Sequence, residues 1–155
     1  MGRTILYVPV SNIFMARAKA VCLTSTEKGH QTGAVIAFQG KILGEAPNKG
    51  SVTSQWAINF HKKFCFRKML GIPSGQKYWI CWWGCAQPKN HAEPSAIRDA
   101  QKEGYSVEGA DLYLYGHWWC CRDCWNAMDK AGIKNVYLCE ETKAQAIAEA
   151  EKAKK

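Results

Sequence analysis

Two short motifs, separated by about a fifth of the chain, constrain its fold more than any other feature. The first is His91-Ala92-Glu93, and the second is Cys121-Arg122-Asp123-Cys124, which begins thirty residues after His91. Each motif stands at the predicted start of a helix, so one imidazole and two thiolates can converge where two helix N-termini meet. Such a ligand set suits a tetrahedral zinc ion that keeps its fourth position open. The chain must therefore fold so that these two helix starts lie together.

A Cys-x-x-Cys motif alone is ambiguous between metal binding and redox chemistry. A redox role would leave His91-Ala92-Glu93 unexplained. A purely structural zinc site would need a fourth protein ligand, which Glu93 or Cys120 offers. Because the two motifs together are far more specific than either one, we predict a catalytic zinc ion. Its predicted ligands are His91, Cys121 and Cys124, and Glu93 is the predicted catalytic acid and base.

The length and composition are those of a globular enzyme. The chain has 155 residues and an apolar content of 47%, which predicts one domain over residues 1–155. No run approaches the roughly 18 consecutive apolar residues of a membrane span, and the first residues do not form a convincing secretory signal. We therefore expect no membrane partner and a cytoplasmic location. In that compartment the eight cysteines stay reduced, which favours metal binding over disulfides.

The positive charge is concentrated in one segment. The net charge is +8, and Ala46 to Ala92 holds seven basic residues and no acidic one. A local basic field concentrates anions. A phosphorylated small molecule or a nucleic-acid backbone would satisfy it. Within this stretch, residues 51–90 are predicted to be a basic insertion rich in cysteine and tryptophan.

The apolar spacing predicts an α/β fold. Helices are expected over 11–22, 55–70, 93–102, 121–131 and 141–155, and strands over 4–10, 33–38, 41–45, 110–115 and 134–139. Ser11 is the expected cap of the first helix, and Gln39-Gly40 is typical of a hairpin turn. In the basic segment, Trp56, Phe60 and Phe64 are expected to be buried, with Ile58 as a further candidate. Residues 78–83 are predicted to form a strand or a buried extended segment.

The two motifs and several flanking segments resemble the deoxycytidylate (dCMP) deaminase family of the zinc-dependent cytidine deaminase superfamily. The segments that carry the resemblance are Phe14-Met15-Ala16, Thr32 to Ile36, Leu70 to Gly75 followed by Cys81, and Ala131 to Val136. Together with the zinc motifs they cover most of residues 11–139. The resemblance implies a three-layer cytidine-deaminase-like fold, with a mixed central sheet of four to five strands flanked by helices.

The same resemblance implies a function. It predicts a zinc-dependent hydrolase that converts a free cytosine nucleotide, dCMP, to dUMP and ammonia, and that assembles as a homo-oligomer, a dimer or a hexamer. Substrate contacts are implied for Asn48, Ala34, Ala92, Ser95 and Trp119. Asn48 is also a common turn former, so both interpretations stay open. The chain departs from the family pattern in having Cys120 where the family has proline and Ser95 where it has asparagine.

Four further residues suggest a second, structural zinc site. They are His61, Cys65, Cys81 and Cys85. Cysteines separated by three residues have an acceptable spacing for zinc, and similar cysteines bind zinc in some relatives. A buried cysteine often serves only as a small apolar residue. Both interpretations therefore stay open.

Tryptophans beside basic residues support two rival hypotheses. Single-stranded nucleic acids are bound by aromatic stacking over a positively charged groove. The tryptophans concerned are Trp82, Trp83, Trp118 and Trp119. One rival is therefore a deaminase of another nucleoside or nucleobase, or of cytosine or adenine in a nucleic acid. The other is a non-catalytic, zinc-stabilised module that binds nucleic acid. Tryptophans near a metal site can equally be pocket walls.

Overall fold

A computed structural model describes residues 4–27, 29–73 and 75–153 of the chain. Ser74, in the Leu70 to Gly75 segment named above, lies outside the described residues, as do 154 and 155 at the end of the predicted terminal helix. All eight cysteines lie in the described part of the chain and are buried there, and none of them forms a disulfide.

The fold is built on a mixed five-stranded sheet, as predicted. Its strand order is β1-β5-β4-β2-β3. The strands are β1 (Ile5–Val8), β2 (Gly33–Phe38), β3 (Lys41–Pro47), β4 (Asp111–Tyr115) and β5 (Asn135–Cys139). β1, β5 and β4 run parallel, whereas β2 is antiparallel to both of its neighbours. The β2–β3 hairpin turns at Gln39 and Gly40, both with positive φ, which fits a tight two-residue turn.

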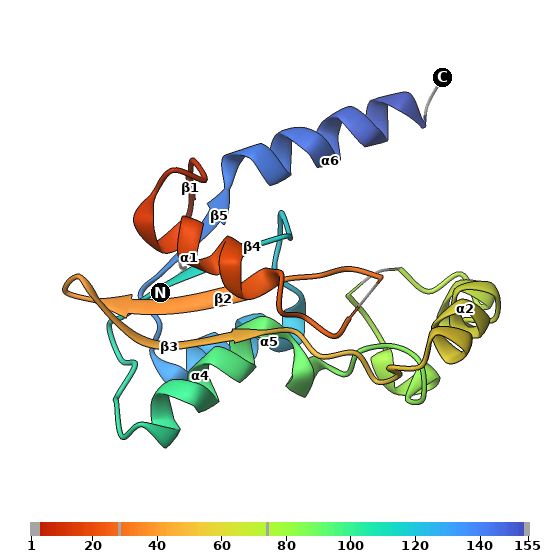
Figure 1. The fold of residues 1–155 in the computed structure, drawn as a ribbon, viewed down its shortest axis with the longest axis horizontal. Coiled ribbons are helices and arrows are strands. Elements are labelled where there is room, and N and C mark those ends of the chain that lie inside the picture. Colours follow the sequence, from red (N-terminus) through yellow and green to blue (C-terminus); the bar gives the residue numbers. More distant parts are fainter. Residues whose placement is uncertain (1–3, 28, 74, 154–155) are drawn as a thin grey trace.

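Helices cover both faces of this sheet, which makes three layers (Figure 1). α1 (Ile13–Cys22) lies on one face, and α4 (Ala92–Lys102) and α5 (Arg122–Ala131) lie on the other. Gly33 and Gly44 allow the close approach. A Cβ at Gly33 would lie 2.4 Å from the Ala18 carbonyl oxygen of α1, and one at Gly44 would lie 2.5 Å from the Ala100 nitrogen of α4. The sheet can therefore contact a helix backbone on each face.

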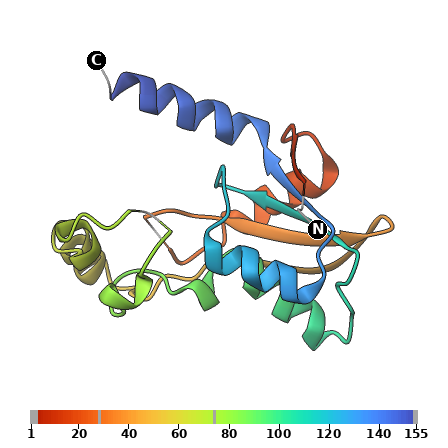
Figure 2. The ribbon, with the colours of Figure 1, turned by 180° about the vertical axis from the view of Figure 1, so that it is seen from behind.

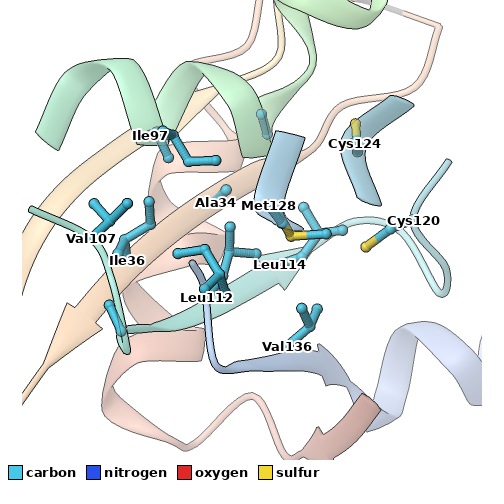
Figure 3. Close-up of a cluster of buried hydrophobic side chains, with 14 of the residues drawn as sticks. Ala34, Ile36, Ile97, Val107, Leu112, Leu114, Cys120, Cys124, Met128 and Val136 are labelled. Atoms are coloured by element: carbon cyan, nitrogen blue, oxygen red, sulfur yellow. The ribbon is translucent and has the colours of Figure 1, made fainter. Parts of the chain in front are cut away.

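Two apolar clusters fill the spaces between the layers. The cluster under α4 and α5 includes Ile36, Leu112, Leu114 and Met128, drawn in Figure 3. The cluster under α1 is smaller and includes Met15. β2 is buried over its first five residues, because it lies inside the sheet with helices on both sides. Its near-continuous apolar sequence is typical of such a strand.

Local chemistry fixes where the helices begin and end. The cap of α1 is Asn12, whose side-chain oxygen accepts hydrogen bonds from the Phe14 and Met15 nitrogens. The prediction of Ser11 was therefore wrong by one residue, which is understandable because both types cap helices well. α5 ends at Gly132, which has a φ of 76°, a conformation that glycine adopts without strain.

The basic segment differs most from the prediction. The expected helix over 55–70 is broken into α2 (Gln55–Lys63) and α3 (Phe66–Met69). Ile58 is buried, but Trp56, Phe60 and Phe64 are 74%, 41% and 48% exposed. They are exposed because this segment lies beside the layered body rather than between its layers (Figures 1 and 2).

Residues 78–83 also differ from their prediction, because a short 3-10 helix, η1 (Tyr78–Cys81), replaces the expected strand or extended segment. A second one, η2 (Pro88–Asn90), leads into α4.

The last helix, α6 (Glu140–Lys152), projects away from the sheet (Figure 1). Its described residues include no buried one, in keeping with a sequence that has few apolar anchors. The Glu141 carboxylate accepts a hydrogen bond from the Val10 nitrogen, which ties the start of the helix to the body. None of the helices in the described ranges combines the length and the apolar character needed to cross a bilayer.

Candidate metal centre and substrate cavity

Two helix starts bring the predicted metal ligands together. His91 is the N-cap residue of α4 and Cys121 is the N-cap residue of α5, both with extended backbone. Cys124 lies one turn into α5 and is 1% exposed. Because α4 and α5 lie side by side on one face of the sheet (Figures 1 and 2), the imidazole and the two thiols meet at their N-terminal ends.

The distances between these three side chains fit a tetrahedral metal ion. His91 Nδ1 lies 3.3 Å from Cys124 Sγ and 3.5 Å from Cys121 Sγ. Ligands bound at about 2.0–2.3 Å around a tetrahedral zinc ion lie about 3.3–3.8 Å from one another. His91 Nε2 lies 3.3 Å from the Ala86 carbonyl oxygen. Such a contact holds the other ring nitrogen in the direction of a metal.

The charge state of the cluster also suits a cation. A hydrogen bond from the Cys124 thiol lowers the pKa of Cys121 to about 4, and the same bond raises the pKa of Cys124. The pair therefore shares one proton. Burial lowers the pKa of His91, but the hydrogen bond with Cys121, the charges of Glu93 and Cys121 and the bond to the Ala86 carbonyl together outweigh burial, and the net pKa is raised. A divalent cation would displace the shared proton, because metal ligation requires thiolates and a neutral imidazole.

Glu93 lies beside this cluster in the first turn of α4. It is 5% exposed, and burial raises the pKa of its carboxyl group. A carboxyl group with a raised pKa near a metal can both accept and return a proton close to neutral pH. The N-terminus of α4 offsets part of the cost of ionising it.

A cavity of about 290 Å³ opens onto this centre. This volume lies near the lower end of the range for small-molecule pockets, about 300–1,000 Å³. Five of the residues predicted for the catalytic centre and the substrate contacts line it: His91, Glu93, Cys121, Asn48 and Trp119. The predicted contacts Ala34, Ala92 and Ser95 are not among its lining residues; all three are buried.

Asn48 ties three segments together at the rim of the cavity. Its side-chain oxygen accepts hydrogen bonds from Ser25 Oγ at 2.6 Å and from the Thr32 nitrogen at 2.9 Å. Its side-chain nitrogen donates to the His30 carbonyl oxygen at 2.7 Å. These bonds leave one amide hydrogen for a ligand. The structural and the substrate-binding interpretations are therefore compatible.

The cavity also has walls that the sequence did not reveal. Tyr78 from η1 packs edge-on against the His91 ring, with centroids 5.0 Å apart. His30 packs edge-on against His117 at 4.8 Å. Burial, reinforced by the charge of His30, lowers the pKa of His117 to about 4. Neither Tyr78 nor His30 belongs to a recognisable motif, and only the fold brings them to the site.

The second predicted group is also brought together. His61, Cys65, Cys81 and Cys85 place one ligand atom each within 4.8 Å of one another. His61 and Cys85 line the same cavity as the first cluster, together with the basic residues Lys62, Arg67 and Lys68. The basic segment thus forms one wall of the cavity.

Comparison with known proteins identifies the family. The family described as the cytidine and deoxycytidylate deaminase zinc-binding region matches residues 10–140. Among curated proteins, no sequence matches the chain.

Similar solved structures include three deaminases. The dCMP deaminase of cyanophage S-TIM5 is 23% identical with a TM-score of 0.51, over 83% of this chain and 82% of that one. A guanine deaminase of Bacillus subtilis is 23% identical with a TM-score of 0.47, over 88% and 69%. A diaminohydroxyphosphoribosylaminopyrimidine deaminase and 5-amino-6-(5-phosphoribosylamino)uracil reductase of Thermotoga maritima is 21% identical with a TM-score of 0.48, over 81% of this chain. This chain covers only 28% of the length of the Thermotoga protein.

The cyanophage structure shows that the chain has the cytidine-deaminase-like fold. The family match extends over most of the chain and includes both motifs that meet at the metal centre. The chain therefore belongs to the cytidine and deoxycytidylate deaminase family and is a zinc-dependent hydrolytic enzyme.

Proposed function

We propose that this enzyme deaminates a free cytosine nucleotide, with dCMP as the preferred substrate and dUMP and ammonia as the products. One observation carries the proposal: the His91, Cys121 and Glu93 side chains share a cavity with Lys62 and Lys68. Its volume of about 290 Å³ suits a small molecule, and the two lysines supply positive charge for a phosphate group. The cyanophage protein of the same fold is a dCMP deaminase.

The proposed chemistry assigns a role to each residue of the centre. His91, Cys121 and Cys124 would hold the zinc ion, which when bound would lower the pKa of a water molecule toward neutral pH. Glu93 accepts a proton from that water and passes it to the ring nitrogen of cytosine. The water oxygen bonds to the ring carbon that bears the amine. The same carboxyl group then takes the remaining proton from that oxygen and delivers it to the amine as the carbon–nitrogen bond breaks, which leaves the carbonyl of uracil. One water is consumed for each ammonia released, so that atoms and charge balance.

The cavity walls are proposed to orient the substrate. Trp119 offers an aromatic face at the cavity that is suited to a base or sugar, and the amide hydrogen left on Asn48 is suited to a sugar hydroxyl. Ala34, Ala92 and Ser95 remain predicted contacts. They are buried in this structure, so we expect them to act by shaping the base pocket from behind.

An ammonia-release assay tests the proposal. Zinc-loaded enzyme is given dCMP, CMP, cytidine, guanine and a cytosine-containing oligonucleotide in parallel, with chelator-treated enzyme as the blank. We expect kcat/KM to be highest for dCMP, and at least about tenfold lower for cytidine because the phosphate contact is lost. Equal rates on dCMP and cytidine would contradict the role of the lysines. Turnover of the oligonucleotide alone would replace the proposal with its polynucleotide rival.

Both nucleic-acid rivals, the polynucleotide deaminase and the non-catalytic binding module, have one specific observation in their favour. Trp56, Trp79 and Trp82 are 74%, 71% and 73% exposed, and all three lie in the basic segment. Exposed aromatic rings beside lysines are suited to stacking with unpaired bases. A filter-binding measurement with single-stranded DNA and RNA at two salt concentrations distinguishes a non-catalytic binding module, which would bind tightly without releasing ammonia.

Two wider features are also proposed. We infer that residues 1–155 act as one deaminase domain, with 51–90 as an insertion in it. We further propose a homo-oligomer, a dimer or a hexamer. The large apolar side chains exposed in the basic segment are available for contacts between subunits. Light scattering coupled to size-exclusion chromatography gives the oligomer mass directly.

A further inference from the structure

One aromatic contact of the metal centre has no part in the proposed reaction. We propose that Tyr78 is a positioning residue for the metal ligand His91, and that the buried Arg67 holds Tyr78 in place. The proposal rests on the ligand set proposed above, and it does not depend on which substrate the enzyme uses.

The His91 ring needs more than one contact to point at a metal ion. Its Nε2 donates to the Ala86 carbonyl oxygen at 3.3 Å, which leaves Nδ1 to face the Cys121 and Cys124 sulfur atoms. A contact at one atom leaves the plane of the ring free to rotate about that atom. The Tyr78 ring supplies a second contact, with centroids 5.0 Å apart and an interplanar angle of 85°, which is a favoured edge-to-face geometry. The two contacts together fix both the direction and the plane of the imidazole.

Tyr78 is itself held by its surroundings. The guanidinium carbon of Arg67 lies 4.4 Å from the centroid of its ring. The Tyr78 carbonyl oxygen accepts a hydrogen bond from Gln87 Nε2 at 3.3 Å. Directly before it, Lys77 has a φ of 48°, in the left-handed region that a lysine rarely adopts. Such a residue persists where the surrounding structure determines its conformation, so the position of the Tyr78 ring is specified by the fold.

Arg67 is suited to hold the ring. It is 8% exposed, and its Nε and Nη2 donate to the Gln76 and Pro73 carbonyl oxygens, both at 2.8 Å. Neither carbonyl carries a formal charge, so the negative face of the Tyr78 ring compensates for part of the cost of burying the cation. A cation–π contact is stronger where water is excluded. Lysine is a poor substitute, since only a planar guanidinium stacks on a ring while it donates in fixed directions.

The pair connects the basic segment to the metal centre. Arg67 lies in α3, and Tyr78 is the first residue of η1. Both line the catalytic cavity. Tyr78 and Trp119 also line a second, neighbouring cavity, so these two rings form the partition between the cavities. A smaller, non-aromatic side chain at residue 78 would leave open space beside His91, and the imidazole would lose the contact that fixes its plane.

Zinc affinity tests the proposal directly. Contacts behind metal ligands typically change metal affinity by about 10–100-fold, so we expect Tyr78→Leu to bind zinc at His91 more weakly by that factor. Tyr78→Phe keeps the ring and should match the wild type. The measurement is competition with a chromophoric chelator, and the ion counted is the one that His91→Ala fails to bind.

Tyr105→Leu is the matched control. Its ring also lies under a cation, with Lys41 Nζ 4.3 Å from the centroid, but it stands beyond the C-terminal end of α4, away from the metal ligands. It should keep the wild-type zinc affinity. An equal loss in Tyr105→Leu and Tyr78→Leu would contradict the positioning role.

Two further measurements separate positioning from other roles. The chain has four histidines, so the imidazole ¹⁵N signals of His91 can be assigned by comparison with His91→Ala, and Tyr78→Leu should shift them. Excess zinc should restore most of the kcat of Tyr78→Leu. Wild-type zinc affinity with a raised KM would show that Tyr78 contacts the substrate instead, and wild-type affinity with wild-type His91 signals would also overturn the proposal.

Arg67→Lys tests the role of the guanidinium. It should weaken zinc binding in the wild-type background and have little further effect in Tyr78→Leu, because Arg67 acts through the ring. Independent effects of the two changes would contradict this coupling. If Tyr78→Leu does not fold, Arg67→Lys decides, since a wild-type zinc affinity would overturn the proposal. Zinc affinity and chemical shifts are measured without a nucleotide, so a failure to deaminate dCMP would count against the proposed substrate alone.

Discussion

At the scale of single residues, the buried carboxyl group beside the metal ligands carries the proposed chemistry. Glu93 is 5% exposed and burial raises its pKa. We expect Glu93→Gln to lower kcat by about 10²–10⁴-fold, which is the range that general acid–base catalysis contributes. Because Glu93 is not a proposed ligand, the zinc content should be unchanged. Ammonia release and elemental analysis on the same sample check both statements, and a variant with wild-type turnover would refute the assigned role.

Asn48 should matter for stability as well as for binding. Replacing it with alanine leaves the buried Thr32 amide without its acceptor, whereas the Ser25 hydroxyl keeps its bond to the backbone carbonyl oxygen of residue 48. An unsatisfied buried polar group costs about 1–3 kcal/mol. The free energy of unfolding of Asn48→Ala, measured by denaturant titration, should therefore be lower than that of the wild type by this amount. Asn59→Ala is the control, since Asn59 is exposed and its side chain accepts a hydrogen bond from Gln55, which is also exposed. A loss in the control as large as that in Asn48→Ala would contradict the argument.

The lowered pKa of the His117 imidazole should make the stability of the protein depend on pH. Its pKa is lowered to about 4 by burial and then by the charge of His30 and His91, and its Nδ1 accepts from the Trp118 nitrogen. Between about pH 6.5, the ordinary value, and pH 4, the unfolded chain binds a proton that the folded chain excludes. Stability should therefore fall as pH falls through this window.

The comparison variant is His117→Asn, whose side-chain oxygen keeps an acceptor but does not titrate. We expect its free energy of unfolding to fall less between pH 7 and pH 5 than that of the wild type, as measured by denaturant titration at both pH values. If the free energy of unfolding falls by the same amount in both proteins, His117 does not contribute to the pH dependence. Release of metal at low pH affects both proteins alike and cancels in the difference.

At the scale of helices and strands, the contact between Gly84 and His61 gives a direct test of packing. A Cβ at residue 84 would overlap the imidazole, so Gly84→Ala should displace His61 from Cys81 and Cys85. In a His61→Ala background the same change should cost little, because the obstructing ring is gone. A double-mutant cycle on thermal stability should give a coupling of about 0.5–3 kcal/mol. Additive effects would contradict the contact.

The elements around the centre were predictable because local signals and burial agree there. The starts of α4 and α5 follow from the two motifs, and the β2–β3 hairpin follows from Gln39-Gly40 between apolar runs. The basic segment was less predictable. Apolar residues at helical spacing suggested that Trp56 and Phe60 face a core, but both are exposed. The break after Lys63 corresponds to no proline or glycine. Cys65, just after the break, lies together with His61, Cys81 and Cys85, and an apolar pattern does not report such a tertiary constraint.

The candidate site was predictable to a similar extent. The metal motifs indicated which side chains would meet, because ligand spacing is encoded within short stretches. Tyr78 and His30 reach the cavity from η1 and from the loop before β2, and no local pattern marks them. Asn48 was recognised only through the family resemblance, although its three side-chain hydrogen bonds show why an asparagine suits that position.

At the scale of the whole molecule, the two metal clusters share one cavity, and chelation should separate them. The second predicted group offers four ligand atoms and the predicted catalytic group offers three, so an ion at the catalytic group should dissociate first, because an open site is easier for a chelator to attack. During titration with a chelator, activity should disappear before α2 and α3 lose protection from proteolysis. Zinc added back at the midpoint should restore turnover. Simultaneous loss of activity and protection would contradict this order.

The outer strands of the sheet bear on how the protein behaves when it is concentrated. β1 has only four residues and is followed by Pro9, and β3 ends at Pro47. Short outer strands and prolines are common safeguards against uncontrolled growth of sheets from one molecule to the next. Concentrated stocks should accordingly resist fibril formation, and any precipitate should arise from the exposed tryptophans instead of from strand pairing.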